Sequence, residues 1–253
     1  MVYRIIAIDE TKIGSHSTLR LTLPAEFSQE SVDTTLWKVD KNYLFPNHYY
    51  YYMIETMFLA DAVELSRHSR ANVLSLGLGG GAVNSFLQYN FPEMKITVVE
   101  ISAQMISLAK KWFDLQIDDH HRVIHADGLT FLKQQAEKGM KYDAVLLDAC
   151  SSTPETAGDF ICPVDLFLKE HVIRSIAQVL SEGGIFATDL APMTMSFAKA
   201  RRLLLRRFSK FFPYCRTNRK MASNGNEIVY CMHHRPIKKE RIDLLKFLND
   251  NPL

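Results

Sequence analysis

Cysteine is scarce in this 253-residue sequence: it occurs four times, and no two copies have the C-x-x-C spacing. That absence excludes the common thiolate zinc sites and a thioredoxin-type redox motif. No signal peptide is recognisable at the N-terminus, so we expect the cysteines to be reduced thiols in the cytoplasm. Cys150 has no identifiable partner histidine, which favours a small buried thiol over a nucleophile.

A charge excess of one sign and long apolar runs are also missing. The 30 Lys and Arg residues nearly balance the 28 Asp and Glu residues, which leaves a net charge of +2. This charge gives almost no long-range attraction to nucleic acid. No apolar run approaches the roughly 18 residues of a membrane span. We therefore predict that neither nucleic acid nor a membrane is a partner.

Two clusters of polar residues are weaker signals. Basic side chains between Lys199 and Lys210 alternate with Leu and Phe, a pattern typical of an amphipathic helix with a solvated basic face. Whether that face docks an acidic partner stays open. His120, His121 and His125 invite comparison with a metal site, but their spacing directs the first two apart and no cysteine or acid cluster completes the set. We predict no bound metal.

The sequence does contain a strand that ends in glycines. The apolar segment Asn72–Leu76 runs directly into Gly77, Gly79 and Gly81, and a helix-compatible segment starts at Ala82. Glycines here permit positive φ and a close approach of the backbone to a nucleotide, while the helix directs free N–H groups toward the same place. The spacing alone fits both a dinucleotide site and the cofactor loop of methyltransferases.

After this loop, short apolar strands alternate with helical patterns. The clearest helix is expected over Gln104–Phe113, where four apolar residues recur at helical spacing. The alternation predicts a doubly wound α/β fold with a mainly parallel sheet that is covered on both faces. The expected strands are residues 73–76, 96–99, 123–125, 144–147 and 185–188.

The two ends of the chain depart from this alternation. Residues 3–8 and 18–23 are strand-like, which predicts a small β appendage over residues 1–42 and a main domain over residues 43–253. Near the C-terminus, segments 212–217 and 227–232 flank turn-rich residues without room for a crossover helix. They predict an antiparallel hairpin, so the sheet should close with a reversed C-terminal strand, as class I methyltransferases do in their Rossmann-like fold.

Three acids follow strands of the predicted sheet, at the edge where the glycine loop lies. Glu100 could accept hydrogen bonds from both ribose hydroxyls of a nucleoside. Asp127 could bind an adenine amine, cap the next helix, or do both. Asp148 could balance a sulfonium cation or contact an incoming amine. A helix expected over residues 45–65 would cover this end of the sheet, and one or two of its tyrosines at 49–52 would line the pocket.

From residue 72 to about residue 233, the chain resembles the spermidine synthase-like branch of class I methyltransferase folds. Within that branch it is most similar to the C-terminal domain of methyltransferase-like proteins that modify translation elongation factor one-alpha. The motifs that carry the likeness are Gly77–Gly81, Phe91–Pro92, Val98–Ile101, Trp112–Phe113, Ala126–Leu129, Tyr142–Val145, Cys162–Pro163 and Asn226–Ile228.

The resemblance implies S-adenosylmethionine as the cofactor. Glu100, followed by Ile101, would bind its ribose, and Asp127, followed by Gly128, would bind its adenine amine. The glycines at 77, 79 and 81 would form the floor of the site, and Asp148 would lie beside the reactive centre.

The loop after the fourth strand departs from the family pattern. Aminopropyltransferases carry Asp-Ser-Ser-Asp-Pro, whose two carboxylates hold and deprotonate a diamine, whereas residues 150–154 are Cys-Ser-Ser-Thr-Pro. Without general acid–base help a reaction slows by about 10²- to 10⁴-fold, so polyamine synthesis by this loop would be badly impaired. Asp148, Glu155 or Asp159 could supply a carboxylate from nearby.

We therefore predict an S-adenosylmethionine-dependent methyltransferase that acts on a protein amine or a small amine, with Asp148 as its catalytic residue. Two other hypotheses stay open. One is an aminopropyltransferase that uses decarboxylated S-adenosylmethionine, and the other is a binding or scaffold protein with weakened catalysis. The oligomeric state is open as well, with a homodimer as one option.

Overall fold

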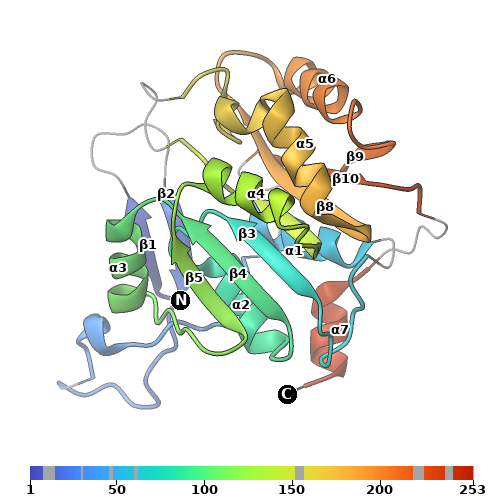
Figure 1. Ribbon diagram of the computed structural model, residues 1–253. Coiled ribbons are helices and arrows are strands. Elements are labelled where there is room, and N and C mark those ends of the chain that lie inside the picture. Colours follow the sequence, from blue (N-terminus) through green and yellow to red (C-terminus); the bar gives the residue numbers. More distant parts are fainter. Residues whose placement is uncertain are drawn as a thin grey trace.

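The computed structural model describes residues 1–7, 15–29, 31–45, 48–59, 62–151, 157–218, 225–236 and 242–252. A large mixed sheet carries helices on both faces, and a separate two-stranded sheet is formed near the N-terminus (Figure 1). The strands are β1 (Tyr3–Ala7), β2 (Ser15–Arg20), β3 (Asn72–Leu76), β4 (Lys95–Glu100), β5 (His121–His125), β6 (Tyr142–Leu147), β7 (Phe160–Cys162), β8 (Leu180–Pro192), β9 (Tyr214–Asn218) and β10 (Glu227–Met232).

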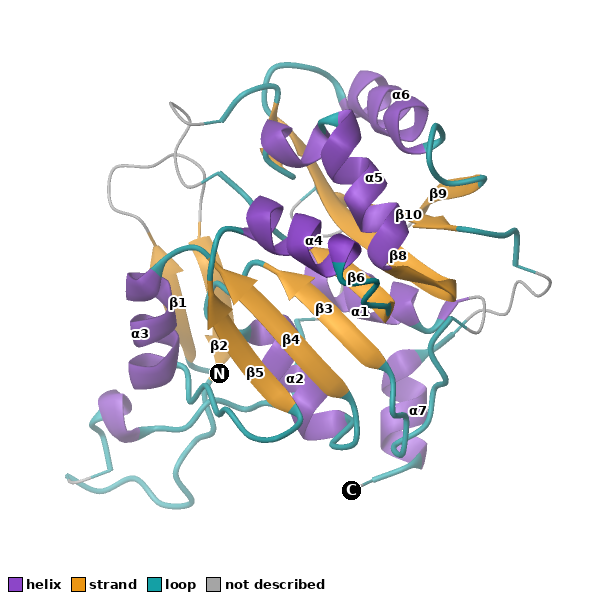
Figure 2. Cartoon of the chain, in the orientation of Figure 1, coloured by secondary structure: helices purple, strands orange, loops and turns teal. Residues whose placement is uncertain are grey.

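The helices form two layers around the large sheet. One buried cluster joins α1, α2 and α7 to one face, and a second joins α4, α5 and α6 to the other. Figure 2 shows α4 and α5 in front of the sheet and α2 behind it. The helices are α1 (Tyr49–Met57), α2 (Ala82–Asn90), α3 (Ala103–Trp112), α4 (Gly128–Glu137), α5 (Glu170–Val179), α6 (Phe197–Phe208) and α7 (Leu244–Asp250), with short 3-10 turns η1 (Thr34–Leu36) and η3 (Asp165–Leu168).

The large sheet is mainly parallel, as predicted. Its order is β5-β4-β3-β6-β8-β10-β9, with β7 paired to β8. The five strands from β5 to β8 are parallel. β10 then runs antiparallel to β8, and β9 antiparallel to β10. The doubly wound sheet with a reversed C-terminal strand is therefore confirmed, although residues 222–224 of the expected turn lie outside the described residues.

The small N-terminal sheet is also present. β1 pairs antiparallel with β2, and Leu21 forms an isolated bridge with Val39. Leu19, Leu21 and Val39 pack with Phe113, which follows α3, in a third buried cluster. The appendage is thus fastened to the large domain, while the boundary proposed at residue 42 stays a prediction.

The helix expected over residues 45–65 is shorter than predicted. α1 covers only Tyr49–Met57, and every residue from Tyr50 to Met57 is buried. A helix that is buried on every side has no solvent-exposed polar stripe, so its sequence has no periodic pattern that marks where it ends. Further along the chain, the basic segment forms α6 as predicted, with Ala200, Leu204 and Phe208 buried on one face.

The expectation of free thiols is wrong. Cys150 is bonded to Cys162, and Cys215 is bonded to Cys231, with Cα–Cα distances of 4.5 and 4.1 Å. Cys215 and Cys231 lie directly opposite each other on β9 and β10. The sequence spacing does not reveal this relation, because it depends on the register of the hairpin. Cys150 is therefore a half-buried bridge residue and not a free buried thiol.

We expect the Cys215–Cys231 bridge to stabilise the hairpin. It closes a loop with a sequence separation of 16, and a loop of about this length restricts the unfolded chain by roughly 3 kcal/mol. The double variant Cys215→Ser, Cys231→Ser should therefore melt several degrees lower without reductant. Thermal unfolding with and without dithiothreitol checks this, and an equal melting temperature for both proteins without reductant would contradict the bridge.

Candidate functional site

A cavity of about 650 Å³ opens at the carboxyl ends of β3, β4 and β6. This is the edge of a doubly wound sheet where ligands usually bind, and the volume is within the usual range for small-molecule sites. Residues from the glycine loop, from the starts of α1 and α4, and from the small N-terminal sheet form its wall. They include Ser17, Thr18, His48, Tyr49, Tyr50, Gly77, Gly79, Glu100, Ile101, Asp127, Gly128, Asp148, Cys150 and Phe167.

Gly77 is the glycine that the backbone requires most strictly. Its φ is +104°, and an added Cβ would lie 2.3 Å from the backbone oxygen of Asp148. Gly79 also lines the cavity, with a φ of +53°. Gly81 is placed differently, since it is the left-handed N-cap residue of α2 and does not belong to the cavity wall. The first two glycines of the predicted floor thus lie in the cavity wall, and the third caps the helix that follows.

Glu100 ends β4 and is held by the backbone on both sides. Its Oε2 accepts a hydrogen bond of 3.0 Å from the Leu78 N–H, and its Oε1 accepts one of 2.8 Å from the Ser102 N–H. Each carboxylate oxygen can accept a second bond, so a fixed pair of acceptors faces the cavity. Ile101 beside it is 68% exposed and forms part of the same wall.

Asp127 caps α4 and lines the cavity at the same time. Its Oδ1 accepts a hydrogen bond of 2.7 Å from the Thr130 N–H, so the capping interpretation is confirmed. Its position in the cavity wall is compatible with the second role, since a carboxylate has further acceptor sites. Gly128 is packed closely, because an added Cβ would lie 3.1 Å from the Phe167 ring.

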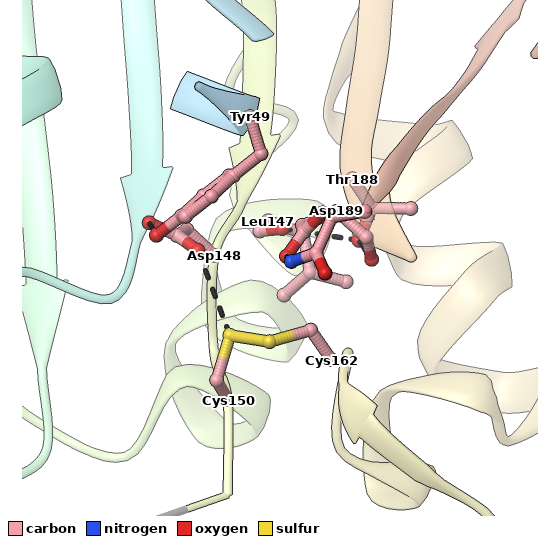
Figure 3. The surroundings of a disulfide bond; sticks show 8 residues. Tyr49, Leu147, Asp148, Cys150, Cys162, Thr188 and Asp189 are labelled. Carbon is pink, nitrogen blue, oxygen red and sulfur yellow. Dashed lines mark hydrogen bonds between the residues drawn. A yellow bond between two sulfur atoms is a disulfide. The ribbon is translucent and has the colours of Figure 1, made fainter. Parts of the chain in front are cut away.

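Asp148 directly follows β6 and lies in the cavity wall. The Tyr49 hydroxyl donates a hydrogen bond of 3.1 Å to its Oδ2 (Figure 3). Burial raises the pKa of the Asp148 carboxyl to about 7, and the hydrogen bond from Tyr49 works in the opposite direction. A carboxyl that titrates near neutral pH can accept a proton from an incoming group and return it to water.

A second acid near Asp148 was not predicted from the sequence. Asp189 on β8 is fully buried, and its Oδ2 accepts a hydrogen bond of 2.6 Å from the Asn226 side chain. Burial and the charge of Asp148 raise the pKa of Asp189. Figure 3 shows both carboxyl groups close to the Cys150–Cys162 bridge. The sequence signal is that Asp189 directly follows an expected strand, as the three predicted acids do.

His48 and the N-terminal sheet were also missed. Burial lowers the pKa of His48 to about 4, so its imidazole is neutral at physiological pH. Ser17 contacts the glycine loop, because its hydroxyl accepts a hydrogen bond of 2.7 Å from the Gly80 N–H. The appendage therefore completes the cavity and does not merely precede the domain. Tyr49 and Tyr50 line the cavity, as predicted for one or two of the four tyrosines.

The loop that departs from the aminopropyltransferase pattern is described only at its ends. Ser152–Glu155 lie outside the described residues, so the suggestion that Glu155 supplies a carboxylate cannot be placed. Asp159 belongs elsewhere, since it is exposed and accepts a hydrogen bond from the Thr194 hydroxyl. Of the predicted carboxylate sources that the structure describes, Asp148 is the one in the cavity wall.

No histidine site for a metal is formed within the described part of the chain. Buried His121 contacts the Asn84 amide and the Gln116 carbonyl, whereas His120 and His125 are exposed. The closest grouping of ligand atoms is Cys150, Cys162 and Asp189, all within 4.8 Å of one another. Its two sulfur atoms are bonded to each other, so they offer no thiolate to a metal.

These features define a Rossmann-like protein with a site for a nucleoside at the carboxyl edge of its sheet and an acid at one end of that site. Comparison with known families adds the relationship. The chain belongs to the spermine/spermidine synthase domain family, whose pattern matches residues 52–233. No helix among the described residues has the length and apolar character needed to cross a membrane.

Known proteins of two kinds resemble the chain. The eEF1A lysine and N-terminal methyltransferase homolog of Drosophila melanogaster is 30% identical over 201 residues, which are 79% of this chain and 29% of the fly protein. The polyamine aminopropyltransferase of Vibrio vulnificus is 28% identical over 160 residues, 63% of this chain and 50% of that protein. The chain thus spans about three tenths of the length of its methyltransferase relatives.

Solved structures give the same two kinds. Human methyltransferase-like protein 13, crystallised in complex with SAH, is 25% identical, with a TM-score of 0.67 over 80% of this chain and 91% of that chain. A probable spermidine synthase from Corynebacterium glutamicum has a TM-score of 0.62 at 15% identity, over 91% of this chain and 81% of that one. The second likeness supports the fold alone.

Proposed function

We propose that the protein is an S-adenosylmethionine-dependent methyltransferase that acts on an amine of a protein. The observation that carries this proposal is the cavity of about 650 Å³ in whose wall Gly77, Glu100 and Asp127 lie together with Asp148. Gly77 and Glu100 lie in this wall, where two backbone N–H groups hold the Glu100 carboxylate, and we propose that the acceptor meets the cofactor beside Asp148. Direct methyl transfer needs mainly this alignment and exclusion of water.

The residues fit the cofactor chemically. We assign Glu100 and Ile101 to the ribose side, Asp127 and Gly128 to the adenine side, and the glycines at 77, 79 and 81 to the floor and its support. When bound, S-adenosylmethionine supplies a methyl group on a sulfonium, whose carbon–sulfur bond breaks as a bond to the acceptor nitrogen forms. Asp148 is proposed to accept the proton that the acceptor amine must lose before it can attack.

Relatives support the choice of acceptor. The proteins that are named eEF1A lysine and N-terminal methyltransferases align with most of this chain, and the human methyltransferase-like protein 13 was crystallised with SAH. Because the chain spans only about 29% of the length of those relatives, eEF1A itself is proposed as one candidate acceptor. Either a lysine side chain or an N-terminus would present the required amine.

An aminopropyltransferase is the second candidate, favoured by the family pattern and by the Vibrio relative. Its substrate would be a small diamine, and the donor would be decarboxylated S-adenosylmethionine. Cys150 and Thr153 stand where aminopropyltransferases have two acids, which counts against this candidate. A cationic amine could nevertheless bind beside Asp148 and Asp189, so the acceptor does not distinguish the two candidate functions. The identity of the bound donor does.

The experiment that separates them compares two donors. We expect calorimetry to show binding of S-adenosylmethionine and S-adenosylhomocysteine, and much weaker binding of decarboxylated S-adenosylmethionine. The reason is that a methyltransferase site also accommodates the carboxylate of the methionine tail. Absence of binding to all three nucleosides at millimolar concentration would refute the proposal, and preference for the decarboxylated form together with polyamine production would establish the alternative.

A third outcome would support a scaffold protein. In that case the protein would bind S-adenosylmethionine but transfer no labelled methyl group to any protein of a lysate.

We propose the cytoplasm as the compartment, because eEF1A is a translation factor. We also propose a homodimer as one assembly state. Disulfides are more common in oxidising compartments, so cell fractionation combined with alkylation of free cysteines is the direct test of location.

A further inference from the structure

Asp148 and Asp189 are neighbours because of the sheet register. β6 and β8 are parallel, and Leu147 is paired with Thr188. The next residue on each strand is an aspartate, so the two acids follow the last paired positions of adjacent strands. The Thr188 hydroxyl donates to the Leu147 carbonyl at 3.0 Å, which fixes the strands at this point.

Both acids also lie near one disulfide. The Oδ1 of Asp148 lies 3.6 Å from the Cys150 Sγ, and a carboxylate oxygen of Asp189 lies within 4.8 Å of both sulfur atoms (Figure 3). Disulfide sulfur carries no proton, so the bridge donates a hydrogen bond to neither acid. The bridge therefore does nothing to compensate the charge of either acid.

Asp189 has an oxygen without a partner. Its Oδ1 is buried and accepts no hydrogen bond from the described residues, while Oδ2 is bonded to Asn226. An unpartnered ionised oxygen at full burial is unfavourable, so burial favours the protonated form of Asp189 when no cation is near. Neither Asp148 nor Asp189 forms an ion pair with a lysine, arginine or histidine among the described residues.

The proposed reaction brings two positive charges to this place. One is the sulfonium of the donor, and the other is the acceptor ammonium, because alkyl amines stay protonated near neutral pH. Asp148 alone can balance only one of them. In a medium of low dielectric constant, an unbalanced charge is much less favourable than in water.

We propose that Asp189 supplies the second negative charge of the site, so that the enzyme selects acceptors which carry an ammonium group. This inference rests on the proposed methyltransferase function. Asp189 lies behind the cavity wall and acts through its charge, together with Asp148, without touching the substrate. With a neutral acceptor such as a hydroxyl or an amide, Asp189 stays protonated and contributes no attraction, so such an acceptor would bind less tightly than an ammonium.

Charges and protons balance in this scheme. Before transfer, two cations face two carboxylates. One proton passes from the ammonium to Asp148, the freed nitrogen lone pair forms the bond to the methyl carbon, and the sulfur keeps the electron pair of the broken bond. Afterwards one methylated ammonium faces a pair of acids that shares one proton, which is released to water with the products.

The test compares a neutral and a cationic nucleoside. n-Butylammonium serves as a probe for the lysine side chain. Calorimetry measures its affinity for the protein loaded with one of two nucleosides. S-Adenosylhomocysteine has no sulfonium, whereas sinefungin carries an ammonium in its place. We expect Asp189→Asn to weaken the binding of n-butylammonium by about tenfold in the sinefungin complex and by much less in the S-adenosylhomocysteine complex. n-Butanol, which is neutral, should bind equally poorly to the unaltered protein and to Asp189→Asn.

Asp143→Asn is the matched control. Asp143 is at the start of β6, where it accepts hydrogen bonds from the Asn72 N–H and the Ser181 hydroxyl, remote from the cavity wall. Its replacement should change neither affinity. Equal losses in both complexes of Asp189→Asn, or no loss in either, would overturn the proposal.

A measurement on the unaltered protein keeps the test decisive if Asp189→Asn does not fold. Calorimetry in two buffers of different ionisation enthalpy gives the protons released when n-butylammonium binds. We expect a larger release in the sinefungin complex, because Asp189 must then ionise, and equal release in both complexes would contradict the proposal. Failure of the proposed function differs from both results, since then neither nucleoside would bind at all.

Discussion

Replacing Asp148 by Asn is expected to lower kcat by about 10²- to 10⁴-fold, because the variant loses the group that accepts the amine proton. The Asn side chain has nearly the same shape and can still accept the hydrogen bond that the Tyr49 hydroxyl donates at 3.1 Å. Affinity for S-adenosylhomocysteine should therefore stay close to that of the unaltered protein. Steady-state methylation and calorimetry measure the two quantities separately.

The pH profile distinguishes a base from a residue that only supports the site. Because the pKa of Asp148 is raised to about 7, its ionised form is lost as the pH falls below this value. For the unaltered protein we expect kcat/KM to fall about tenfold per pH unit on the acid side and to level off above neutrality. Asp148→Asn should lose this limb, and Asp143→Asn should keep it. An unchanged limb in Asp148→Asn would show that another group is the base.

Much of the fold could be predicted because its signals are local. The parallel strands are short and apolar, as burial on both faces of a sheet demands, and β3 runs straight into its glycine loop. The C-terminal hairpin was evident from the lack of room for a crossover helix. The five segments predicted for the parallel part of the sheet fall inside the observed strands, although β8 extends well beyond residues 185–188. The predicted segments 18–23 and 212–217 overlap β2 and β9 only in part.

The acids of the site show where such prediction ends. Glu100, Asp127 and Asp148 each follow a strand of a parallel sheet, so their common edge follows from the topology. Asp189 also follows an expected strand, but its importance depends on pairing with a strand about forty residues earlier, on a neighbouring amide and on full burial. Those relations are set by tertiary packing and carry no local signal.

The cysteines also depend on tertiary pairing, and here the prediction of free thiols was wrong. Without C-x-x-C spacing they gave no reason to expect a bridge, yet the register of β9 and β10 places Cys215 against Cys231. Similarly, Cys150 and Cys162 meet because β7 returns to the end of β8, a short pairing that no sequence pattern marked. Cysteine spacing alone therefore does not reveal whether the cysteines form disulfides, and it is a weak basis for inferring the cellular compartment.

Gly77→Ala is expected to weaken S-adenosylhomocysteine binding by about a hundredfold or more, equivalent to roughly 2.7 kcal/mol. The added Cβ would lie 2.3 Å from the backbone oxygen of Asp148, and no flexible side chain can yield there. Separation of the backbones would also disturb two bonds that hold the loop, from the Gly77 N–H to the Val99 carbonyl and from the Asp148 N–H to the Leu76 carbonyl, both 2.9 Å long.

Gly139→Ala separates this clash from backbone strain. Gly139 has a φ of +67°, so alanine there also adopts a left-handed conformation at about 1 kcal/mol, but no atom lies within 4 Å of the added Cβ. It should lower the melting temperature slightly and leave binding unchanged. If Gly77→Ala binds S-adenosylhomocysteine as tightly as Gly139→Ala does, the close approach at Gly77 is not what shapes the nucleoside site. A large loss confined to Gly77→Ala, measured by calorimetry on protein that still unfolds cooperatively, would tie cofactor binding to the contact between the glycine loop and Asp148.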